Sequence, residues 1–154
     1  MKLAVPAENK SVESRVAISP DAVKAYVKKG MDVVVEAGAG AGSSISDDAF
    51  AAAGATIAKG TAAAVKGADI LLTVRRPSDA ALKAIKQGAV IAGQLDPHGD
   101  KKGLSALAKS DFNAFAMELM PRITRAQSMD VLSSQANLAG YKSVIDAAAQ
   151  FGRA

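Results

Sequence analysis

The densest group of hydrogen-bonding side chains lies in the stretch PRITRAQSMDVLSSQANLAGYKSV (121–144). Eight of them fall within sixteen positions: Arg122, Arg125, Gln127, Asp130, Ser133, Ser134, Gln135 and Asn137. Amides, hydroxyls and a carboxylate recognise the hydrogen-bond pattern of a ligand, and the two arginines add positive charge. Together these groups could bind ribose hydroxyls, a carboxamide and a phosphate.

The spacing in this stretch leaves two interpretations open. If the segment were helical throughout, Gln127, Asp130, Ser134, Asn137 and Tyr141 would form one polar stripe at intervals of three and four residues. The alternative is a capping loop whose polar side chains satisfy backbone groups. Spacing alone favours neither.

A second candidate is Arg15, in the segment ESRVAISP between the first predicted strand and the first predicted helix. Ligands of α/β proteins bind at this edge of a sheet, and a guanidinium there could bind a carboxylate or phosphate through two hydrogen bonds. The alternative is an ion pair with a neighbour such as Glu8 or Glu13.

The glycine-rich segment EAGAGAGSS (36–44) follows a predicted strand, as a dinucleotide-binding loop does. A G-x-G-x-x-G match needs glycines at 38, 40 and 43, and position 43 is serine. The next predicted strand ends in Lys59 instead of an acidic residue. We therefore interpret the segment as a turn with positive φ angles.

Composition excludes several classes of site. The chain has no cysteine and one histidine, His98, in the turn LDPHGD, so we expect no disulfide, thiol nucleophile or metal site. The net charge is +4, but the basic residues are scattered and aromatic residues make up 4%, so we expect no nucleic-acid binding. The N-terminus becomes charged within ten residues, which is not typical of a signal peptide or a membrane span.

Apolar runs alternate with alanine-rich helical stretches along the chain. We predict strands at 2–7, 31–37, 55–59, 68–74, 89–95 and 113–119, and helices at 19–30, 46–54, 61–67, 77–88 and 101–110. Continuous apolar strands alternating with helices predict an α/β fold, with a mostly parallel sheet of flavodoxin-like or Rossmann-like type flanked by helices. A long helix from about Ser133 to Phe151 ends the sequence.

The segment PRITRAQSMDVLSSQANLAGYKSVIDAAAQFGR closely resembles the NAD(H)-binding component, the alpha subunit, of proton-translocating NAD(P) transhydrogenase. The resemblance continues upstream in ESRVAISPDAVKAYVKKGMDVVVEAGAGAGSSISDDAFAAAGATI and FAMELMPR, and covers nearly the whole chain. Alanine dehydrogenase shares this N-terminal fold. The resemblance implies an N-terminal lobe at 1–132 and a connector helix at 133–154 that leads toward a Rossmann lobe, which this chain does not contain.

The resemblance also implies a function. In this family NADH lies between two lobes, and the polar loop corresponds here to Arg122, Gln127, Asp130 and Ser133, which would hold the nicotinamide carboxamide and ribose. Gln127 would position the ring for direct hydride transfer from NADH to NADP⁺, which a partner subunit binds, in the Re/Si-specific, proton-translocating reaction. The protein would then contribute to catalysis by positioning the reacting nicotinamide. We expect the chain alone to be inactive.

The partners and location follow from the same resemblance. We expect NADP(H)-binding and membrane subunits as partners, a homodimer, and a cytoplasmic location peripheral to the inner membrane. An alternative is a non-catalytic dimerisation or subunit-docking module, which the apolar residues Met117, Met120, Ile123, Met129 and Leu132 favour.

Alanine dehydrogenase is a less favoured alternative. That family uses an arginine in the motif matched by ESRVA, a lysine in that matched by TVRRP and a histidine in that matched by GQLDP. This chain keeps Arg15 but has Arg75 and Gln94 at the other two positions, and neither replaces lysine or histidine chemically.

Overall fold

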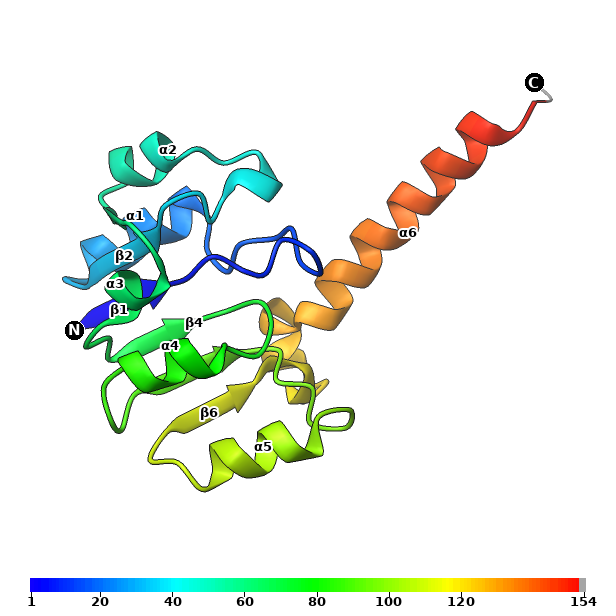
Figure 1. The fold of residues 1–154 in the computed structure, drawn as a ribbon. Helices are drawn as coiled ribbons and strands as arrows, with labels where there is room; N and C mark the ends of the chain where they lie inside the picture. Colours follow the sequence, from blue (N-terminus) through cyan, green and yellow to red (C-terminus); the bar gives the residue numbers. More distant parts are fainter. Residues whose placement is uncertain (153–154) are drawn as a thin grey trace. The chain divides into compact units, whose positions relative to one another are not determined.

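A six-stranded parallel sheet organises the first 116 residues of the computed structural model, which describes residues 1–152 (Figure 1). The strands are β1 (Lys2–Val5), β2 (Asp32–Glu36), β3 (Thr56–Ala58), β4 (Ile70–Leu72), β5 (Val90–Gly93) and β6 (Asn113–Ala116). Their order is β3-β2-β1-β4-β5-β6, and every neighbouring pair is parallel. This is the strand order of the Rossmann fold, so the predicted fold class is confirmed.

Serine caps start three of the helices that join these strands. The helices are α1 (Pro20–Lys28), α2 (Asp47–Ala52), α3 (Thr61–Val65), α4 (Asp79–Ala84) and α5 (Lys101–Ala108), with a 3-10 turn η1 (Ala41–Ser43). Ser19, Ser46 and Ser78 each accept a hydrogen bond from the amide three residues later, which satisfies one free donor of the first turn.

Helix α4 is shorter than the predicted helix at 77–88. It ends at Ala84, because Ile85 takes an extended conformation with ψ of 164° and buries its side chain in the core. Tertiary packing overrides helix propensity at this position.

The two faces of the sheet carry separate apolar cores. One contains Val23 of α1 and Phe50 of α2 together with Leu3. The other contains Val65 of α3, Ala81 of α4, Ile85 just after α4, and Leu107 of α5. Because successive strand residues point to opposite faces, Leu3 and Ala4 belong to different cores, and the strands need apolar residues at every position.

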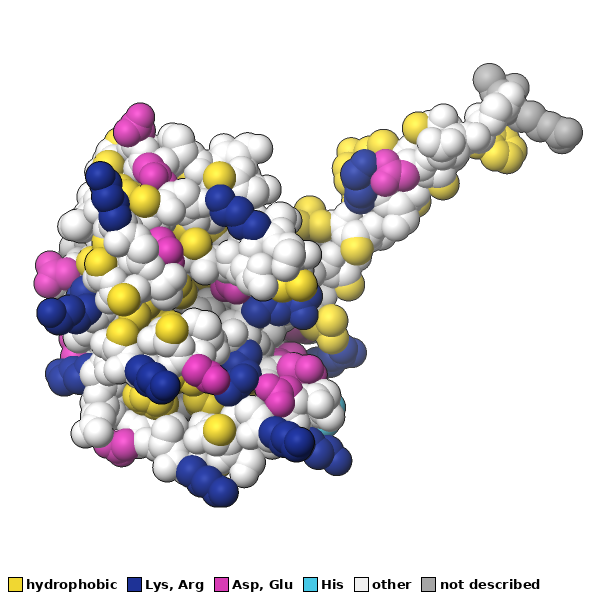
Figure 2. All heavy atoms as spheres, viewed as in Figure 1, with side chains coloured by type: hydrophobic (Ala, Val, Ile, Leu, Met, Phe, Trp, Pro, Cys, Tyr) yellow, Lys and Arg dark blue, Asp and Glu magenta, His cyan; other side chains and the backbone are white. Residues whose placement is uncertain are grey.

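A second compact unit begins at Met117. It contains the 3-10 turns η2 (Met117–Leu119) and η3 (Thr124–Met129) and the long helix α6 (Val131–Gln150). The predicted strand at 113–119 therefore ends at Ala116, and its last three residues form η2. No residue of α6 is buried, and Figure 2 shows hydrophobic side chains along its length.

The predicted final helix is confirmed as a helix, but it starts two residues earlier than predicted, at Val131. Arg153 and Ala154, the end of the predicted connector at 133–154, lie outside the described residues. Within residues 1–152, no helix combines the length and the apolar character that a membrane span requires.

Candidate functional site

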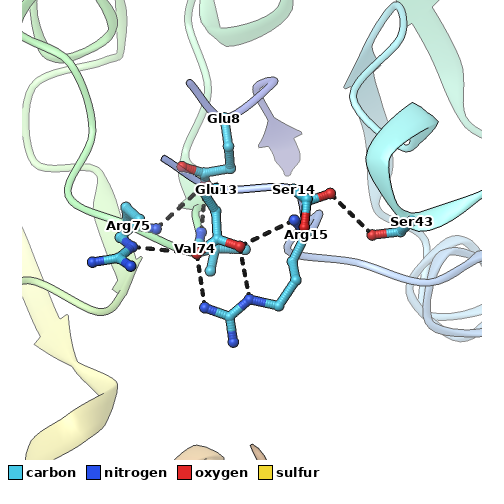
Figure 3. A network of polar contacts seen from close by, with 7 residues as sticks. All are labelled: Glu8, Glu13, Ser14, Arg15, Ser43, Val74 and Arg75. Atoms are coloured by element: carbon cyan, nitrogen blue, oxygen red, sulfur yellow. Dashed lines mark hydrogen bonds and ion pairs between the residues drawn. The ribbon is translucent and has the colours of Figure 1, made fainter. Parts of the chain in front are cut away.

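The carboxyl edge of the sheet brings four charged residues together where the strand order reverses, between β1 and β4 (Figure 3). Glu8, Glu13 and Arg15 come from the loop after β1, and Arg75 comes from the loop after β4. Arg15 donates from Nε to Glu13 Oε1 at 2.8 Å and from Nη2 to Oε2 at 2.7 Å. Arg75 donates from Nε to the same Oε2 at 3.2 Å. The ion-pair alternative for Arg15 is therefore the one observed.

Two guanidinium groups determine the charge of Glu13. Its side chain is 5% exposed, and the hydrogen bonds from Arg15, followed by that from Arg75, lower its pKa to about 2 although burial acts in the opposite direction. The Arg15 guanidinium is stabilised in turn, since Glu13 raises its pKa. This carboxylate is charged at any physiological pH.

Glu8 binds the same loop after β4 in a different way. Its Oε1 accepts hydrogen bonds from the backbone amides of Val74 at 2.6 Å and Arg75 at 3.4 Å. Burial raises the pKa of Glu8, and the nearby charge of Glu13 adds to this, while the two amides and Arg75 oppose it. The sequence offered Glu8 only as a partner for Arg15, and its position two residues after Pro6 gave no sign of a bond to the distant loop.

The glycine-rich segment after β2 packs against the chain itself. Gly38 has φ of 74°, which confirms the predicted turn, and its amide donates to the Asp47 carboxylate at 2.8 Å. A Cβ at Gly40 would lie 2.7 Å from a ring carbon of Phe50, and one at Gly42 would lie 2.3 Å from the carbonyl oxygen of Ser14. With its amide already bound to a carboxylate, this loop does not fit the pyrophosphate of a dinucleotide.

A small cavity of about 120 Å³ lies beside this charged group, lined by Glu8, Lys10, Glu13, Arg15 and residues of the glycine-rich loop. His98 is exposed in the loop after β5. Among residues 1–152, no group of three or more His, Asp or Glu side chains is placed to hold a metal ion.

The second unit places two of the predicted cofactor-binding residues in direct contact. Asp130 is the N-cap of α6, and its Oδ1 accepts from the amides of Leu132 at 3.0 Å and Ser133 at 3.2 Å. The Ser133 hydroxyl donates to Oδ2 at 2.5 Å. These bonds, with that of the Ser133 hydroxyl first, lower the pKa of Asp130, and the charge of Arg122 contributes.

The other two predicted residues, Arg122 and Gln127, are exposed. Gln127 lies in η3, next to the buried Ala126, and its side chain makes no hydrogen bond within the part of the chain that the structure describes. Both its amide donors and its carbonyl acceptor are thus available to a ligand. Amide donors beside a carbonyl acceptor are the groups that pair with another amide.

The polar stripe suggested by a fully helical segment does not form. Asp130 has ψ of 99°, so it separates the 3-10 turn that carries Gln127 from helix α6, which carries Ser134 and Asn137. The capping interpretation is correct for Asp130. The Gln127 side chain caps nothing among the described residues.

Comparison with known proteins identifies the family of this chain. Residues 4–139 match the family model described as "Alanine dehydrogenase/PNT, N-terminal domain". The chain belongs to this family. The whole chain is 52% identical to an NAD(P) transhydrogenase subunit alpha of Rhodospirillum rubrum, and 94% of it is 31% identical to an alanine dehydrogenase of Methanococcus maripaludis. The resemblance stated from sequence is thereby confirmed.

Solved structures agree with this family. All of the chain superposes on the transhydrogenase from Sinorhizobium meliloti with a TM-score of 0.91 at 51% identity, and 77% of it on an L-alanine dehydrogenase with 0.71 at 26% identity. The chain spans 41% of the Rhodospirillum rubrum protein and 44% of the Sinorhizobium meliloti chain.

Within this family, two positions separate the chain from the alanine dehydrogenase pattern. Arg75 occupies the expected lysine position and forms an ion pair with Glu13. Gln94 occupies the expected histidine position, and its backbone amide donates to the Val74 carbonyl oxygen at 3.0 Å. Neither side chain can act as an acid or base near neutral pH.

Proposed function

We propose that this chain is part of the NAD(H)-binding component of an NAD(P) transhydrogenase, and that residues 121–133 position the nicotinamide end of NADH. Its partners would be an NADP(H)-binding subunit and membrane subunits that hold the component at the cytoplasmic face of the inner membrane and couple the reaction to proton translocation. Similarity over the whole chain to transhydrogenase alpha subunits supports this assignment.

The observation that carries the proposal is the exposed, unpartnered Gln127 beside a fixed Asp130. Asp130 is held by three hydrogen bonds from the first turn of α6, so it is a rigid reference point. A carboxylate accepts about four hydrogen bonds, so Asp130, which is 7% exposed, keeps one acceptor position. The Ser133 hydroxyl donates a hydrogen bond to Asp130, and its oxygen can still accept one.

In this proposal the bound nicotinamide supplies the hydride chemistry, and the protein supplies position. Gln127 would orient the carboxamide through its own amide, and Arg122 would add positive charge at the same end of the cofactor. No acid, base or nucleophile of this chain is required. The pyrophosphate would be bound elsewhere, since the loop at Gly38 does not fit it.

The test is Gln127→Asn in the complete transhydrogenase, with Gln87→Asn as the matched control, because Gln87 is exposed and lies before β5, at the amino edge of the sheet. Shortening the side chain by one methylene should slow single-turnover hydride transfer about tenfold or more, since small misplacements are costly at this step. NADH affinity should change less than about twofold. Unchanged hydride transfer in Gln127→Asn would refute the positioning role.

Exposed apolar residues of α6 support a second function, dimerisation or subunit docking. Leu138, Tyr141, Val144 and Ile145 are 60%, 70%, 70% and 46% exposed. We expect sedimentation without nucleotide to show a mass that rises with concentration, and Leu138→Glu to abolish the rise. A strict monomer at high concentration would exclude this role for the chain.

A further inference from the structure

Two carboxylates of the chain join the loops after β1 and β4. Both come from the loop between β1 and α1, and both reach the short loop between β4 and α4 (Figure 3). Glu8 binds the backbone of that loop through the amides of Val74 and Arg75, and Glu13 binds the Arg75 side chain. Ligands of doubly wound sheets bind at such a reversal of strand order, and these bonds lie at that point of the sheet.

We propose that Glu8 and Glu13 form a proton-sensitive latch between these two loops, in which Glu13 stays bound and Glu8 loosens the loop after β4 when it takes up a proton. The latch is independent of the proposed NADH-positioning role of residues 121–133.

Glu13 is the permanent half because two guanidinium groups bind it in a nearly buried position. Arg15 contacts both of its oxygens, and Arg75 contacts one of them. Bidentate, charge-assisted bonds of this kind are strong, and they hold the pKa of Glu13 at about 2. No change of pH within the physiological range alters this half of the latch.

Glu8 is the sensitive half because its bonds depend on its charge. An ionised carboxylate accepts an amide hydrogen bond about twice as strongly as a neutral group does. The charged groups that face Glu8 are Glu13 and Arg15 from its own loop, Arg75 from the loop after β4, and Lys10 beside the cavity. The glycine-rich loop contributes only Gly38, Ala39 and Gly42 to that cavity, none of which has an ionisable side chain.

The environments of the two carboxylates support the same assignment. Burial and the charge of Glu13 raise the pKa of Glu8, so this carboxyl is the first of the pair to be protonated as the pH falls. Protonation removes the charge of Glu8 and weakens its hold on the amides of Val74 and Arg75.

The latch is tested by hydrogen exchange of the complete protein between pH 7.5 and 4.5, read on peptides that cover residues 73–76. Rates are corrected for intrinsic exchange with an unstructured reference peptide. We expect the protection of the Val74 and Arg75 amides to fall about fivefold or more across this range, the difference between a charged and a neutral acceptor. Peptides from the buried strand β2 should keep their protection.

Two variants make the assignment specific. Glu8→Gln keeps the shape and a carbonyl acceptor but cannot titrate, so its protection at 73–76 should be low at pH 7.5 and should not change with pH. Glu13→Gln should keep the titration but move its midpoint to lower pH, because a like charge is removed and Arg75 is released toward Glu8. Constant protection in the wild type, or a titration that survives in Glu8→Gln, would overturn the proposal.

Discussion

Replacing Glu13 by glutamine keeps the volume of the side chain and removes the charge that two guanidinium groups bind. The pKa of this carboxyl is lowered from 4.5 to about 2 in the folded protein. At about 1.36 kcal/mol per pH unit, the difference sets an upper limit of about 3 kcal/mol on its contribution to the free energy of unfolding. Arg15 and Arg75 are 38% and 57% exposed, so water screens part of this, and we expect about 2 kcal/mol.

The pH dependence of this loss has a definite direction. A carboxyl whose pKa is lower in the folded state stabilises the protein fully above its unfolded value, here 4.5, and the contribution disappears as the pH falls toward 2. Urea unfolding followed by circular dichroism at pH 7 should therefore show a midpoint lower by about 1 M for Glu13→Gln. Near pH 2 the two proteins should unfold at the same urea concentration.

The control for this experiment is Asp21→Asn. Asp21 pairs with Lys24 on the surface of α1, where its side chain is 92% exposed, so its loss should cost less than about 0.5 kcal/mol. If Glu13→Gln were no more destabilising than Asp21→Asn at pH 7, the argument that the two arginines make Glu13 a major stabilising group would be refuted.

Two further predictions concern the helix cap and the glycine-rich loop. Asp130→Ala removes the acceptor of the first α6 amides, so these amides at residues 132–134 should lose protection against hydrogen exchange. In the wild type, the same loss of protection should appear as falling pH protonates Asp130, whose pKa is lowered. Unchanged protection in the variant would contradict the cap. Gly42→Ala should lower the melting temperature more than Gly38→Ala, because a Cβ at position 42 would lie 2.3 Å from the Ser14 carbonyl oxygen. At position 38 the only cost of a side chain is the positive φ of 74°. Calorimetry of the two variants tests this order.

The sequence predicted the fold well because its signals are local. Serines before Pro20, Asp47 and Asp79 mark helix starts, and apolar runs such as ILL in β4 mark buried strands. It failed where packing decides, as at Ile85, where a residue inside a helical pattern leaves the helix to fill the core.

The candidate site was predictable only in part. Residue types drew attention to Arg15 and to the stretch after Pro121, and the local spacing of Asp130 and Ser133 is that of an N-cap. The bond from Val74 to Glu8 joins residues 66 positions apart, and that from Arg75 to Glu13 joins residues 62 apart. Contacts at this separation depend on the order of strands in the sheet, which periodicity does not reveal. The connector at 133–154 and the cofactor-binding roles of Arg122, Gln127, Asp130 and Ser133 stay predictions.

The central position of β1 has a consequence for synthesis on the ribosome. Once made, β1 can pair with β2 about thirty residues later, but its other edge pairs with β4, in the register Leu3 to Ile70 and Ala4 to Leu71. Until β4 has been made, the nascent chain holds a three-stranded sheet with one open edge at its most apolar strand. That edge is where a chaperone would bind or where aggregation would start, so slow translation between residues 36 and 70 should lower the yield of folded protein.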